Sequence, residues 1–116
     1  DAYGFRFTSK DKVIVFSGDT GPSKSLEDYA KDADILVHEV YSYAGFLQKT
    51  KDWQIYHKSH HTSTYEVGEI ASRAKPKLLV LSHILFWGAD EQDILEETRT
   101  TFSGNIKIAE DLMVIK

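Results

Sequence analysis

Side chains that can bind a metal ion or carry a proton follow three short apolar runs in this sequence: Asp19, the pair His38 and Glu39, and His83. If the three runs form neighbouring parallel strands, these groups meet at one edge of a sheet, where open α/β folds place their sites. Imidazoles and a carboxylate at one place suit zinc or manganese. The pattern therefore predicts metal-dependent chemistry.

Each candidate also has an ordinary structural explanation. Asp19 could be only a turn residue, and His61 could only flank the start of a helix. His83 could be a core histidine bonded to a backbone carbonyl, and His38 is the histidine most expected to be merely buried. His57 is expected at the surface of a loop. The joint placement at strand ends, rather than any single residue, favours a site.

The elements that must position these residues alternate between strands and helices. Alternation and apolar runs predict strands over residues 3–8, 12–17, 35–37, 78–81, 105–109 and 112–115. The third and fourth are expected to end at His38-Glu39 and Ser82-His83. This order predicts an α/β layer fold, and the length indicates that residues 1–116 form one domain or part of one.

Three helices are predicted between the strands. The first has Leu26, Tyr29, Ala30 and Ala33 on one face. The second opens with a capping box of the form S-x-x-E at Ser63 and buries Val67, Ile70, Ala71 and Ala74. The third is capped by Asp90 and turns Ile94, Leu95, Thr98 and Phe102 inward.

Aromatic residues concentrate in segments without clear periodicity. Residues 40–61 predict a long loop that serves as a lid or binding loop, or whose aromatic side chains pack on the body of the domain. Residues 84–88 predict a short apolar loop. Trp53, Tyr56, Phe86 and Trp87 are the candidates from these segments for contact with a substrate.

Composition narrows the function classes. The chain has a net charge of −4, which argues against a general nucleic-acid-binding face. It has no cysteine, which excludes disulfides, thiolate metal sites and a cysteine nucleophile. Apolar residues make up 41% of the chain, enough for a core, yet no apolar run is long enough to cross a membrane.

With these residues assembled, the sequence resembles the C-terminal half of a metallo-β-lactamase-fold hydrolase. The resemblance is nearest to the branch that includes ribonuclease Z, related phosphodiesterases and arylsulfatases. It rests on four motifs in order, at residues 16–22, 33–39, 61–63 and 79–83. It implies half of an αββα sandwich, a mixed β-sheet with helices on one face.

The resemblance also implies roles for individual residues. Asp19 matches a carboxylate that bridges two metal ions, and His83 matches a histidine that binds the second ion. Glu39 and His61 match a pair in which the histidine stabilises charge or protonates the leaving oxygen while the carboxylate orients it. The implied cofactor is two zinc ions, with manganese or iron as alternatives.

One part of the family pattern is missing from this chain. The family carries a His-x-His-x-Asp-His run and a further histidine in its N-terminal half, and no such run occurs here. Asp19 and His83 are fewer protein ligands than a catalytic zinc normally has. We therefore expect that an N-terminal half is supplied in cis or in trans, and that this chain alone does not catalyse.

Three functions remain open. The first is a metal-dependent hydrolase acting on a small-molecule ester, forming a homo-oligomer in the cytoplasm, without membrane contact and with nucleic acid an unlikely partner. The second is a non-catalytic α/β module that binds a ligand or partner and has a degenerate metal site. The third is an RNA-processing nuclease, ranked lower because of the acidic balance.

Overall fold

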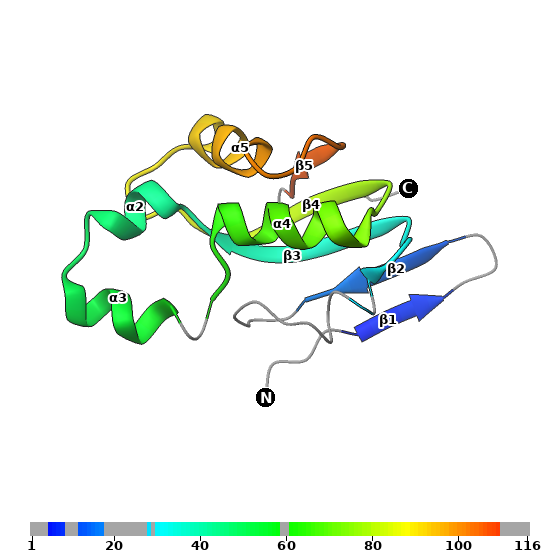
Figure 1. Cartoon of the computed structure of the whole chain (residues 1–116), viewed down its shortest axis with the longest axis horizontal. Coiled ribbons are helices and arrows are strands. Elements are labelled where there is room, and N and C mark those ends of the chain that lie inside the picture. Colours follow the sequence, from blue (N-terminus) through cyan, green and yellow to red (C-terminus); the bar gives the residue numbers. More distant parts are fainter. Residues whose placement is uncertain (1–4, 9–11, 18–27, 29, 59–60, 110–116) are drawn as a thin grey trace.

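The computed structural model describes residues 5–8, 12–17, 28, 30–58 and 61–109. Its five strands form one mixed sheet in the order β1-β2-β3-β4-β5 (Figure 1). The bounds of the strands are β1 Phe5–Thr8, β2 Val13–Phe16, β3 Ile35–Tyr41, β4 Leu78–Leu85 and β5 Ile106–Ile108. β1 pairs antiparallel with β2, and the other neighbours are parallel. The neighbouring parallel strands on which the predicted site depends are confirmed.

Helices α4 (Thr64–Ala74) and α5 (Glu91–Arg99) cover one face of this sheet. The alternation of side chains along a strand sends Leu36 and Val40 to this face, where they join one core with residues of both helices. The side chains that alternate with these along each strand point to the other face, where Ile35, Val37 and Val80 belong to a second apolar cluster. Within the described residues this is the predicted architecture, a mixed sheet with helices on one face.

Both covering helices begin as the sequence predicts. At α4, the side chain of Ser63 accepts a hydrogen bond from the backbone N–H of Glu66, whose side chain accepts from the backbone of Ser63. Asp90 and Asp93 form the same reciprocal arrangement at α5. The predicted apolar face of α4 is buried, and so are Ile94, Thr98 and Phe102.

The aromatic stretch expected to be a loop is instead partly helical. It contains α2 (Tyr43–Leu47) and α3 (Lys51–Lys58), which lie beyond the end of the sheet at which β3 ends (Figure 1). The hydroxyls of Ser42 and Thr50 accept hydrogen bonds from backbone N–H groups in the first turns of these helices. Because the two helices are short, hydrophobic periodicity could not reveal them.

Two strands are longer than predicted. β3 continues through His38 and Glu39 to Tyr41, and β4 continues through Ser82 and His83 to Leu85. The expectation that residues 84–88 form a loop is therefore wrong for Ile84 and Leu85, which pair with β3. Because these strands are longer, His38, Glu39 and His83 lie within the strands instead of after their ends.

Parts of the prediction fall on residues that the structure does not describe. They are most of the predicted helix from Leu26, the predicted strand over residues 112–115, and Asp19. Ala30 and Ala33, the last apolar positions of that helix, are buried in the core. Among the described residues, no helix is long and apolar enough to span a membrane.

Candidate functional site

Glu39 lies at the centre of the candidate site. Its side chain is 3% exposed. Oε1 of Glu39 accepts a hydrogen bond of 3.1 Å from the backbone N–H of Thr62 and lies 3.5 Å from Nδ1 of His61. The structure thus brings together the two residues that the sequence pairs as catalytic candidates.

Backbone contacts hold the two segments of this pair in register. The N–H of Tyr41 donates to the carbonyl of Thr62 at 3.0 Å, and Tyr41 forms an isolated parallel bridge with Ser63. His61 therefore reaches Glu39 from a segment that runs alongside the end of β3. Because a carboxylate facing Nδ1 orients the imidazole, Nε2 of His61 points away from Glu39.

Ser17 ties the end of β2 to the same place. Its N–H donates to the carbonyl of Val37 at 2.9 Å, and its hydroxyl accepts from the N–H of Glu39 at 3.0 Å. The loop that carries Asp19 follows directly in the sequence, but Asp19 itself lies outside the described residues. Its role as a bridging ligand stays a prediction.

His83 occupies a bulge in β4. Glu39 pairs with Ser82 and the next residue of β3, Val40, pairs with Ile84, so His83 has no residue opposite it. Its φ angle of 47° is in the left-handed region, which a non-glycine residue adopts only where the surroundings enforce it. Bulges next to active sites redirect a side chain. His83 is exposed rather than a core histidine, which leaves its imidazole accessible to a ligand.

His38, in contrast, has a structural position. It is fully buried, and its Nδ1 lies 2.7 Å from the backbone oxygen of Glu39. Burial lowers the pKa of His38 to about 4, so the imidazole is neutral at pH 7. The expectation that His38 is simply buried is confirmed.

His57 is the residue that the sequence analysis placed wrongly. It belongs to α3 instead of a loop, and its ring stacks on that of His61 with centroids 5.8 Å apart. It also packs on Trp53 at 4.0 Å and on Trp87 at 5.5 Å. The signal that could have found it is the cap at Thr50, which starts a helix that brings His57 back toward His61.

The four candidates for substrate contact lie in different surroundings. Trp53 and Trp87 pack edge to face at 4.3 Å, in a cluster with Tyr41 and Phe46. Tyr56 is 63% exposed, and Phe86 packs against the main core. Trp87 has a left-handed φ of 46°, and its ring contacts those of Tyr41, Phe46 and Trp53.

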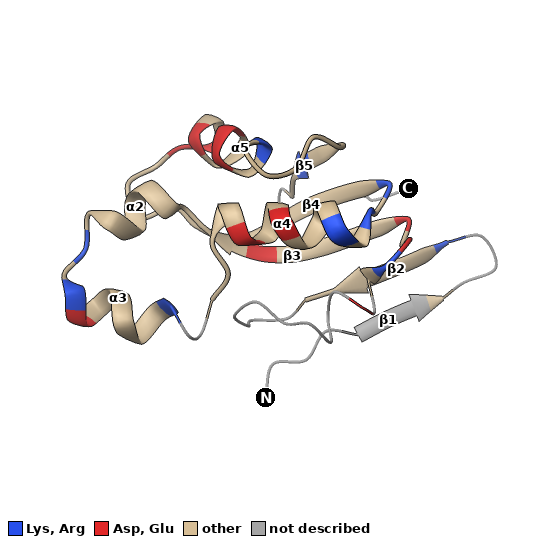
Figure 2. Cartoon of the chain, viewed as in Figure 1, with Lys and Arg blue, Asp and Glu red and all other residues tan. Residues whose placement is uncertain are grey.

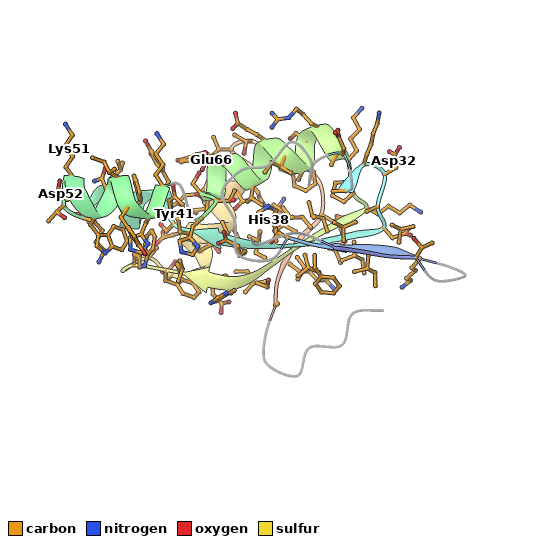
Figure 3. The ribbon with its side chains drawn as sticks, turned by 90° about the horizontal axis from the view of Figure 1, so that it is seen from below. Asp32, His38, Tyr41, Lys51, Asp52 and Glu66 are labelled. Carbon is orange, nitrogen blue, oxygen red and sulfur yellow. The ribbon has the colours of Figure 1, made fainter. Side chains whose placement is uncertain are left out.

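A cleft of about 610 Å³ lies between α2, α3 and the start of α4. Its lining is Tyr41, Tyr43, Phe46, Leu47, Lys51, Gln54, Ile55, Lys58, Ser63, Tyr65 and Glu66. None of the four candidates for substrate contact lines it, although Trp87 lines a smaller depression of about 280 Å³ beside α2. Figure 3 labels Tyr41 and Glu66, which line this cleft from β3 and α4.

The described residues do not make up a metal site by themselves. They contain no group of three or more histidine, aspartate or glutamate side chains that could hold a metal ion. Of the two predicted ligands, only His83 is described, and its exposed imidazole is a donor suited to zinc, manganese or iron. A complete ligand set requires groups beyond those described.

Comparison with known proteins gives the relatives of this chain. No family model matches it. It is 36% identical over 108 residues to a ribonuclease Z of Archaeoglobus fulgidus, covering 92% of this chain and 33% of the relative. The ribonuclease Z of Bacillus velezensis is 33% identical over 108 residues, covering 91% of this chain and 33% of the relative. These relatives and the solved structure described next confirm the predicted resemblance to the ribonuclease Z branch of the metallo-β-lactamase-fold proteins.

A solved structure agrees with this resemblance at the level of the fold. The metallo-β-lactamase fold protein YhfI from Bacillus subtilis matches with a TM-score of 0.75 and 23% sequence identity. The match covers 92% of this chain and 40% of YhfI. The predicted metallo-β-lactamase-type fold is therefore confirmed, and the chain spans about a third of the length of its ribonuclease Z relatives.

The ribonuclease Z relatives correct one prediction. They are named as ribonucleases, which overturns the expectation of a small-molecule ester substrate with nucleic acid an unlikely partner. That expectation used the net charge of the whole chain. Helix α5 alone carries four carboxylates, whereas α3 carries lysines at both ends (Figure 2). The net charge of the whole chain therefore does not describe the charge near α3.

Proposed function

We propose that the full-length protein is a metal-dependent hydrolase that cleaves phosphodiester bonds in RNA, and that this chain supplies part of its active site. The observation that carries the proposal is the contact between the buried carboxylate of Glu39 and the partly exposed imidazole of His61. The names of the ribonuclease Z relatives support RNA as the substrate.

The role proposed for His61 is to stabilise developing charge or to protonate the leaving oxygen. Glu39 orients the ring by facing Nδ1, which leaves Nε2 on the side of the ring away from this carboxylate. The N–H of Thr62 holds the carboxylate through a second contact, which limits its rotation. In this proposal Glu39 is a positioning residue and His61 is the catalytic one.

Asp19 and His83 are proposed as the ligands that this chain contributes to a site for two zinc ions, with manganese or iron as alternatives. Divalent cations at such a site supply a water of lowered pKa and polarise the phosphoryl group. The exposed position of His83 at the bulge supports its part in this proposal. The other ligands would come from an N-terminal half, in cis or in trans.

The experiment measures RNA cleavage and metal content of the full-length protein and of the variant His61→Ala. We expect the variant to keep its metal and to lose about 10²- to 10⁴-fold in rate, the range typical of a general acid or base. Glu39→Gln is measured beside it, and its matched control is Glu69→Gln, at an exposed position on α4, which should cleave as the parent does. Equal rates for His61→Ala and the parent would contradict the proposal.

A further inference from the structure

One face of helix α3 lines the cleft and is not buried. Lys51, Gln54, Ile55 and Lys58 line the cleft and recur at the spacing i, i+3, i+4 and i+7. No residue of α3 is buried, and Ile55 is 65% exposed. A helix face of this kind adds little to the core, so its composition is better explained by contact with a ligand.

The opposite wall of the cleft is aromatic. Tyr43 and Tyr65 meet edge to face with ring centroids 5.1 Å apart, and Tyr43 stacks with Phe46 at 6.2 Å. Tyr43 is 38% exposed. Its ring is therefore fixed by two neighbours and still presents surface, which suits stacking against a flat ligand.

Among the residues that line the cleft, the two cations Lys51 and Lys58 outnumber the one carboxylate. Neither Lys51 nor Lys58 has an ion-pair partner within the described part of the chain. The one carboxylate among the described lining residues is Glu66, and its Oε1 accepts the N–H of Ser63 at 3.0 Å in the capping box. Figure 2 shows the basic positions of α3 at the two ends of the helix. The cleft thus combines an aromatic wall with two cations.

The cleft lies next to the Glu39–His61 pair. Tyr41 and Ser63 line it and come two residues after Glu39 and His61, respectively. The bridge between Tyr41 and Ser63 fixes these two segments together. A ligand in the cleft would therefore be held beside the pair that we propose to act on the scissile bond.

We propose that this cleft binds an unpaired nucleotide of the RNA substrate, adjacent to the bond that is cleaved. The base stacks on Tyr43, and phosphates lie against Lys51 and Lys58. Stacking on aromatic side chains requires an unpaired base, since bases inside a duplex are already stacked on each other. The inference rests on the proposed function, because it takes RNA as the ligand.

Binding of a fluorescein-labelled single-stranded adenosine decamer tests the inference. Fluorescence anisotropy is measured with the full-length protein in a chelator, so that binding is separated from cleavage. The double variant Lys51→Glu/Lys58→Glu should bind at least about tenfold more weakly, with a salt slope reduced by about 0.7 for each phosphate that the variant no longer neutralises. Lys107→Glu, an exposed lysine on β5, is the control and should bind like the parent.

The aromatic wall is tested separately. Tyr43→Ala should weaken binding by about fivefold or more, the lower range for removal of a stacked aromatic ring, and Tyr43→Phe should restore it. A duplex RNA of the same length should bind more weakly than the decamer. Equal binding of the duplex, or a double variant that binds like Lys107→Glu, would overturn the inference.

Cleavage assays on the same variants separate the two proposals. If the parent cleaves RNA and the cleft variants bind and cleave equally well, the inference fails and the proposed function stands. If the decamer binds through the cleft and no RNA is cleaved when metal is present, the proposed function fails and the binding site stands.

Discussion

Glu39 and His38 are neighbours in one strand with opposite surroundings. Alternation along β3 sends His38 toward the helices, where it is fully buried, and sends Glu39 toward the segment that carries His61. The pair His38-Glu39 therefore supplies a buried structural imidazole and a carboxylate that contacts His61. The burial of His38 is predicted from its place beside an apolar run, whereas the pairing of Glu39 with His61 is what the resemblance to the metallo-β-lactamase-fold hydrolases implies.

The burial of His38 predicts a dependence of stability on pH. Because burial lowers the pKa of His38 from 6.5 to about 4, the unfolded chain takes up a proton here at higher pH than the folded chain does. The stability that comes from a neutral His38 is complete above pH 6.5 and is lost as the pH falls toward about 4. At pH 4.5 the loss should be about 2–3 kcal/mol, at about 1.4 kcal/mol per pKa unit.

Urea denaturation of the full-length protein and of His38→Gln at pH 7 and pH 4.5 measures this loss. The variant has no titrating group at this position, so its free energy of unfolding should fall by about 2 kcal/mol less than that of the parent. The comparison uses the difference between two pH values, so the cost of the substitution itself cancels. The same loss in both proteins would show that His38 does not contribute.

At the scale of elements, Glu97 of α5 connects three parts of the fold. Its carboxylate accepts hydrogen bonds from the hydroxyl of Ser42 at 3.1 Å, the N–H of Tyr43 at 2.9 Å and the hydroxyl of Thr64 at 2.7 Å. Ser42 and Tyr43 start α2, and Thr64 starts α4. Glu97 therefore joins α2, which lines the cleft, to α4, which covers the sheet.

Removal of this carboxylate should loosen α2. We expect Glu97→Ala to lower the free energy of unfolding by about 2 kcal/mol, since hydrogen bonds to a charged group contribute about 1.5–3 kcal/mol each and solvent screens this partly exposed one. Proteolysis within α2 and α3 should also become faster. The neighbouring Glu96→Ala, which is exposed, is the control and should change stability by less than about 0.5 kcal/mol.

Close packing also holds α2 against the turn after β4. A Cβ atom at Gly45 would lie 2.7 Å from the backbone oxygen of Trp87 and 2.8 Å from that of Phe86. Glycine is required there because the helix approaches the backbone closely. Neither this close approach nor the set of hydrogen bonds at Glu97 has a signature in the local sequence, since both join segments distant along the chain.

These elements show where prediction from sequence succeeds and where it fails. The capping box at Ser63 and the apolar runs of β3 and β4 are local signals, and both are confirmed. The bulge at His83 is not a local signal, because it depends on the register between two strands. The helices α2 and α3 escape prediction for another reason, since they are too short for hydrophobic periodicity to reveal them.

At the scale of the whole molecule, charge is unevenly distributed. The net charge of −4 led to the wrong expectation that nucleic acid is an unlikely partner. The acidic residues of α5 dominate this value, while the cleft is lined by lysines from α3. Binding to a phosphate backbone depends on the local field at the contact surface rather than on the average.

The described residues contain no group of three or more side chains that could hold a metal ion, and the relatives are about three times as long as this chain. The expectations of an N-terminal half in cis or in trans, of a homo-oligomer and of a cytoplasmic location stay predictions. So does the expectation that the chain alone is inactive. The account as a whole depends on whether the complete protein cleaves RNA with a bound metal.

The most direct measurement is therefore the rate of RNA cleavage by the full-length protein before chelation, after removal of metal by a chelator, and after zinc, manganese or iron is added back. The account predicts cleavage that is lost on chelation and restored by at least one of these ions. A correctly folded full-length protein that holds metal and cleaves no RNA, or one whose cleavage is unaffected by chelation, would contradict it.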